Sequence, residues 1–145
     1  MKWHRKKEHI IGNRTVLPEG WRRPKGYSNA VVAQGRQIYV AGQVGWDSEE
    51  RFNSDDIVEQ ATQALRNVVA VLEAAGAGPE HIVRMTWYGT DKAAYIAGLK
   101  GIGEAYREII GRYFPAMTAV EVTALVEDRA KVEIECTAVV DDDSV

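Results

Sequence analysis

The sequence predicts an α+β fold with the element order β-β-β-α-β-α-β-β, one mixed sheet carrying both helices on one face. Three observations lead to this prediction. Two apolar stripes of helical period occupy the middle of the chain, short β-branched runs precede each of them, and two alternating runs close the sequence. The 145 residues, 46% of them hydrophobic, are enough for one domain with its own core.

The segment before the first helix predicts three short strands. One lies near residues 10–16, and two partly β-branched runs follow at residues 30–33 and 37–41. The residues between these two runs are Gln34-Gly35-Arg36, and a glycine in a three-residue loop is a hairpin signal. We therefore expect the second and third strands to pair as a hairpin.

The first helix begins at a group of capping residues. Asp56 offers an N-cap oxygen and Glu59 follows it by three residues, as in a capping box. Gly76 stands at the usual C′ position after the helix. Between them the apolar residues recur at spacings of three and four: Ile57, Ala61, Leu65, Val68, Leu72 and Ala75.

A strand over residues 81–88 and a second helix follow. Asp91 caps this helix, whose apolar stripe consists of Tyr95, Leu99, Ile102, Tyr106, Ile109 and Tyr113. Gly98, Gly101 and Gly103 lie inside it, and each costs up to ~1 kcal/mol relative to alanine. Close packing of the helix on a sheet explains them better than a phosphate-binding loop, which needs a strand-to-helix turn.

Two alternating strands, residues 118–126 and 131–140, close the domain. The apolar face of the last strand is Val132, Ile134, Cys136, Ala138 and Val140, and its polar face is Glu133, Glu135 and Thr137. On the preceding strand we expect Val120, Val122 and Ala124 to join the apolar face, opposite Ala119, Glu121 and Thr123. The half-polar sheet face then meets either water or another subunit.

The charge divides the chain into a basic arm (residues 1–25), a folded domain (26–140) and an acidic tail (141–145). The arm has eight Lys/Arg against two acidic residues, whereas residues 26–145 have ten against nineteen. Basic and aromatic residues together are typical of single-strand binders, but the acidic body repels phosphate, so a solvated arm is favoured over nucleic-acid binding. No run of ~18 apolar residues predicts a membrane span.

The single thiol, Cys136, points to the apolar side of its strand, so we expect an inert core residue in a reducing, cytoplasmic setting. No metal-ligand spacing or cofactor motif occurs, and a cation on Glu121, Glu133 and Glu135 is less favoured than solvated carboxylates. Glu133, in the middle of a strand, is either one half of an ion pair across an interface or a catalytic carboxylate.

Five segments resemble the motifs of one known family. They are Gly26-Tyr27-Ser28-Asn29-Ala30, Ala41-Gly42-Gln43-Val44, residues 67–76, Tyr113-Phe114-Pro115-Ala116 and Lys131-Val132-Glu133-Ile134-Glu135. In order and spacing they are similar to P-Y-S-x-A, S-G-Q-I, N-x-x-x-x-L-E-A-A-G, F-P-A and K-I-E-I-E of the YjgF/RidA family of enamine/imine deaminases. The resemblance covers about residues 26–140.

The resemblance implies a chorismate-mutase-like homotrimer with a small-molecule cleft at each subunit interface and no cofactor. It implies that Glu133 handles water and proton transfer to the imine, while Tyr27 contributes pocket wall and Gly42 a backbone contact. It also implies that the half-polar sheet face points into the trimer.

The chain departs from the family's pattern after F-P-A. Met117 stands where family members have an arginine that binds the substrate carboxylate, and Ala119 stands where some have a pocket cysteine. Period two puts both on one strand face, which we expect to line the pocket rather than the core. Trp87 and Tyr88 make this pocket more aromatic than is usual in the family.

Three functions remain open. The first is a divergent imine/enamine hydrolase that uses Glu133 on a substrate without a carboxylate, or with one held by another arginine: Arg14, Arg36, Arg22 or Arg23. The second is a trimer that binds a small metabolite without turning it over. The third is an RNA- or protein-binding regulator that acts through the basic arm.

Overall fold

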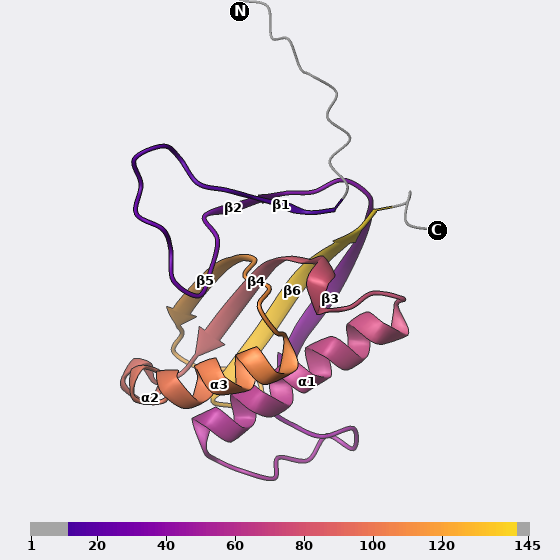
Figure 1. Ribbon diagram of the computed structural model, residues 1–145. Helices are drawn as coiled ribbons and strands as arrows, with labels where there is room; N and C mark the ends of the chain where they lie inside the picture. The colour runs from indigo at the N-terminus through magenta and orange to yellow at the C-terminus, as the bar shows by residue number, and fades with distance from the viewer. Residues whose placement is uncertain (1–11, 142–145) are drawn as a thin grey trace, which may run out of the picture.

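The computed structural model describes residues 12–141 and confirms the α+β architecture (Figure 1). Its elements are β1 (Arg14–Val16), β2 (Ala30–Val32), β3 (Arg36–Val44), α1 (Ile57–Ala74), the short 3-10 turn η1 (Pro79–His81), β4 (Ile82–Gly89), α2 (Lys92–Ala97), α3 (Leu99–Ile109), β5 (Ala116–Glu121) and β6 (Val132–Val140). Residues 1–11 of the predicted arm and 142–145 of the predicted tail lie outside the described residues.

The main sheet has four strands in the order β3-β6-β4-β5. It is mixed, as predicted: β6 runs antiparallel to β3 and β4, while β4 and β5 are parallel. A parallel pair needs a crossover, which α2 and α3 supply. α1 and α3 lie side by side on one face of the sheet, as expected (Figure 1).

The predicted hairpin of the second and third strands is wrong. β2 pairs with β1 in a separate two-stranded sheet, and β3 pairs with β6. Gly35 shows the reason: it has φ +142°, and a Cβ there would lie 2.7 Å from the carbonyl carbon of Val140. The glycine thus serves the close approach of β3 to the end of β6 rather than a turn between neighbouring strands.

The first helix follows its prediction closely. The Asp56 side chain accepts a hydrogen bond from the Glu59 N–H at 3.0 Å. At the other end Gly76 has φ +79°, and the N–H groups of Gly76 and Ala77 donate to the carbonyls of Glu73 and Leu72, which is the Schellman motif. No helix of residues 12–141 is long and apolar enough to cross a bilayer.

The second helix is divided at Gly98 into α2 and α3, where one continuous helix was predicted. A Cβ at Gly101 would lie 2.8 Å from Val58 Cγ1 on α1, and one at Gly98 would lie 3.1 Å from Val58 Cγ2. Close packing therefore explains these two glycines, although the neighbour is a helix rather than the sheet. A Cβ at Gly103 would meet nothing within 4 Å.

The core lies between the sheet and α1 and α3. The predicted apolar face of β6 is buried. The predicted orientation of β5 is wrong: Met117 packs against the core, and Val120 on the other face is 44% exposed. Alternation fixes which residues share a face but not which face turns inward, and this edge strand has apolar residues on both.

Candidate functional site

The main sheet separates the predicted site residues into groups. Trp87 and Ala119 are register partners on the helix side of β4 and β5, which is also the side that Met117 faces. Glu133 neighbours the buried Ile134 on β6 and points to the opposite, half-polar face. In one chain these residues therefore do not form a single cleft.

Glu133 and Gly42 lie together on the half-polar face. A register shift between Val40 and Gln43 places Gly42 in an irregularity of β3. A Cβ at Gly42 would lie 2.9 Å from Glu133 Cδ, so the glycine leaves room for this side chain against the β3 backbone. Within residues 12–141 the half-buried Glu133 has no hydrogen-bond or ion-pair partner. Its carboxylate is available to a bound molecule.

A polar cleft of about 520 Å³ runs along the same sheet face. The Tyr88 hydroxyl donates a hydrogen bond to Glu135 Oε1 at 2.7 Å, and this bond, helped by burial, raises the pKa of Tyr88. Arg84 also lines the cleft, exposed and without an ion-pair partner in the described chain.

Sequence reasoning missed Arg84. Arg84 and Tyr88 share a face by period two, which was the signal that could have found it. Arg84 does not occupy the place where the resemblance implies an arginine, because Met117 stands at that place and faces the other side of the sheet.

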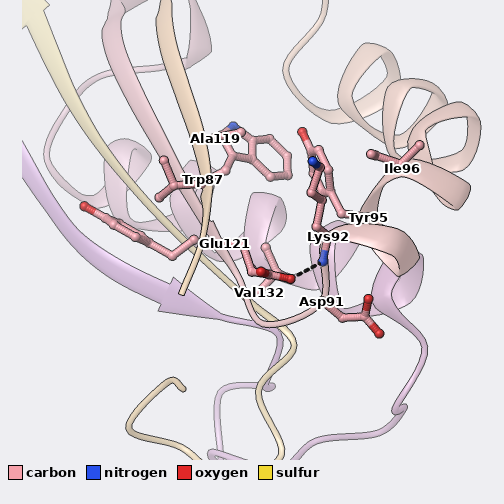
Figure 2. Close-up of a pocket in the computed structure, with 11 residues that line it drawn as sticks. Trp87, Asp91, Lys92, Tyr95, Ile96, Ala119, Glu121 and Val132 are labelled. Atoms are coloured by element: carbon pink, nitrogen blue, oxygen red, sulfur yellow. Dashed lines mark hydrogen bonds between the residues drawn. The ribbon is translucent and has the colours of Figure 1, made fainter. Parts of the chain in front are cut away.

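A second, more apolar pocket of about 210 Å³ opens on the helix side, between α2 and β5 (Figure 2). The rings of Trp87 and Tyr95 meet edge to face with centroids 6.5 Å apart, and Ala119 forms part of the wall. The Trp87 Nε1–H is buried and has no acceptor in the described chain, so packing alone holds the indole. Tyr95 was predicted as part of an apolar helix stripe, which gave no sign that it lines a pocket.

The charged groups of this pocket are tied to the start of α2. The Glu121 carboxylate accepts from the Lys92 backbone N–H at 2.8 Å, as the dashed line in Figure 2 marks. Asp91 accepts from the Ala94 N–H at 3.0 Å as the N-cap of α2. Both carboxylates thus bind the start of α2, and the lining of the pocket is mostly apolar.

Tyr27 lines neither cavity and is 42% exposed. The segment that carries it is fixed beside β5: the Ser28 N–H donates to the Pro115 carbonyl at 3.0 Å, and the Ser28 hydroxyl donates to the Phe114 carbonyl. This places Tyr27 close to the start of the strand that carries Met117.

Cys136 is buried, as predicted, and burial raises the pKa of its thiol to about 12. A thiol of this kind is a poor nucleophile at neutral pH. Residues 12–141 contain no group of three or more His, Cys, Asp or Glu side chains placed to hold a metal ion.

Comparison with known proteins decides the family. The family model described as endoribonuclease L-PSP matches residues 22–140. The human 2-iminobutanoate/2-iminopropanoate deaminase is 35% identical over 114 residues, 78% of this chain and 79% of its own length. The chain belongs to the YjgF/RidA family. Within this family, the RutC family protein UK114 of Drosophila melanogaster is 36% identical and covers 77% of this chain and 78% of its own length.

Solved structures of YjgF/RidA proteins share the fold. The Rid family protein YyfB of Yersinia pestis superposes with a TM-score of 0.80 at 31% identity, covering 90% of this chain and 100% of its own. RidA of a Psychrobacter species gives 0.64 at 29% identity, covering 82% and 92%. The predicted family membership is therefore confirmed.

Proposed function

We propose that the chain is an imine/enamine hydrolase whose clefts form between subunits of a homotrimer. In each cleft Glu133 of one copy faces the Trp87–Ala119 pocket of another copy. The separation of these residues onto opposite sheet faces supports a shared cleft, because a second chain is needed to bring them together. The names of the deaminase relatives support the chemistry.

One observation carries the proposal: the Glu133 carboxylate lies half-buried against Gly42, with no hydrogen-bond or ion-pair partner among residues 12–141. There it accepts a proton from water while the water oxygen adds to the imine carbon. The proton passes to the nitrogen, the carbon–nitrogen bond breaks, and imine plus water becomes a carbonyl compound plus ammonia. No redox step or cofactor is required.

In this proposal the substrates are limited by what position 117 lacks, because Met117 packs against the core and offers no charged group to the cleft. A thioether has no donor for a carboxylate, and a missing charge-assisted hydrogen bond costs ~1.5–3 kcal/mol. Tyr27, beside the start of β5, and Gly42, beside Glu133, border the same shared cleft in this proposal. We expect the substrate to lack the carboxylate that the family's arginine binds.

The test is release of ammonia from imines generated by an amine or amino-acid oxidase. Glu133→Gln should lower the rate of protein-catalysed ammonia release by about 10²–10⁴-fold, the contribution typical of a general acid–base group. Glu104→Gln, at an exposed position on α3, is the matched control and should retain it. Equal acceleration by wild type and Glu133→Gln would refute the proposal.

The second candidate is a non-catalytic trimer that binds a small metabolite. It is favoured because position 117 holds a methionine, which cannot bind a substrate carboxylate as an arginine would. It predicts that a ligand raises the melting temperature while no imine is turned over. Met117→Arg should then change which ligands stabilise the protein, with carboxylates gaining most. The single buried thiol, Cys136, supports a cytoplasmic location for either candidate.

A further inference from the structure

We propose that the pocket of Trp87, Tyr95 and Ala119 binds an uncharged aromatic ring. Resting on the proposed function, we infer further that the imine substrate of this chain carries such a ring in place of a carboxylate. The inference follows from the size, the walls and the charges of the pocket.

The volume of the pocket suits one ring with a short substituent. It measures about 210 Å³, whereas an apolar cavity of about 150 Å³ binds benzene. The small side chain of Ala119 keeps the space open beside β5, and Trp87 is only 5% exposed, so its indole is a fixed wall.

The walls favour a ring over a flexible alkyl chain. Trp87 and Tyr95 meet at 60°, so a ring bound beside them can stack on one and meet the edge of the other. In Figure 2 the two side chains point toward one another, with Ile96 at the side of Tyr95. Burial raises the pKa of Tyr95, which keeps its phenol uncharged.

The charges of the pocket disfavour an anionic ligand. Asp91 and Glu121 line it against a single cation, Lys92, whose side chain is exposed. Each carboxylate accepts one backbone hydrogen bond at the start of α2, from the N–H of Lys92 or of Ala94. A neutral or protonated imine is therefore preferred over an imino acid.

Ring binding is tested without turnover. Benzyl alcohol and propionate are titrated into the ¹⁵N-labelled full chain while the indole N–H resonance of Trp87 is followed. Benzyl alcohol should shift this resonance, and Ala119→Leu, which fills the pocket from an exposed position, should weaken binding on the order of tenfold. The matched control Ala93→Leu, exposed on α2 outside the pocket, should bind as wild type.

Light scattering on each variant checks that its assembly is unchanged. The proposal is overturned if propionate shifts the Trp87 resonance as strongly as benzyl alcohol does. It is equally overturned if Ala119→Leu, with unchanged assembly, binds benzyl alcohol as tightly as wild type.

Turnover tests the substrate class. The imine made from benzylamine by an amine oxidase should be hydrolysed at least about tenfold faster than the carboxylate-bearing imine of alanine, a difference of ~1.4 kcal/mol. Glu133-dependent hydrolysis that prefers the alanine imine would overturn the substrate class and leave the hydrolase standing. Ring binding without hydrolysis of either imine would overturn the hydrolase and leave the aromatic site standing.

Discussion

At the scale of single residues, the close contact between Gly42 and the Glu133 side chain can be tested by substitution. A Cβ at Gly42 would lie 2.9 Å from Glu133 Cδ, so Gly42→Ala must displace the carboxylate from the β3 backbone. We expect the variant to fold, to lose ~1 kcal/mol of stability and to lose imine hydrolysis. In a double-mutant cycle with Glu133→Ala the stability cost should disappear, and a cost that persists would contradict the contact.

Cys136 allows a prediction on pH. Burial raises the pKa of its thiol from 9.0 to about 12, so the folded state favours the protonated form. The stabilisation that the protonated thiol gives the folded state is complete below pH 9. It is lost as the pH rises toward 12, and the free energy of unfolding then falls by up to ~1.4 kcal/mol per pH unit. Urea unfolding between pH 8 and 10 should show this decline, which Cys136→Ala should reduce. An equal decline in both proteins would exclude the thiol as its source.

Individual residues show where reading the sequence succeeds. The burial of Cys136 could be predicted because its neighbours at period two are all apolar. The core side of Met117 could not, because either face of an edge strand can turn inward. The pocket at Tyr95 depends on the distance between α2 and β5, which no local pattern encodes.

At the scale of elements, α3 offers a matched pair of substitutions. Gly101→Ala brings a methyl group to 2.8 Å from Val58 Cγ1, so α1 and α3 must move apart. We expect it to destabilise the protein by ~1–3 kcal/mol. Gly103→Ala meets nothing within 4 Å and should stabilise by up to ~1 kcal/mol through helix propensity. Chemical denaturation measures both, and equal effects would contradict the close helix contact.

The elements also differ in how far local sequence determines them. The ends of α1 could be predicted because Asp56 and Gly76 act within four residues along the chain. The partner of β2 could not, since β1 and β3 are both candidates and the choice depends on the approach of Gly35 to Val140.

At the scale of the whole molecule, the proposed shared cleft predicts complementation between two impaired variants. Glu133→Gln keeps an intact ring pocket, and Ala119→Leu keeps an intact carboxylate. When the two are unfolded together and refolded as mixed oligomers, roughly a quarter of the clefts should unite both intact halves. Ammonia release at low imine concentration should rise accordingly, whereas the two proteins mixed after separate folding should show only the average of their own rates. No recovery in the mixed oligomers would show that one chain supplies the whole cleft.

Glu133 and Trp87 lie on opposite faces of one sheet, and this separation affects how the protein can evolve. Substitutions on the helix side of β4 and β5 can alter which molecule is recognised while the carboxylate of Glu133, the proposed proton acceptor, stays unchanged. Changes at positions such as 117 and 119 can therefore alter the ligand without altering the side chain of Glu133. Ligand specificity and the proposed catalysis can therefore evolve independently within one small domain.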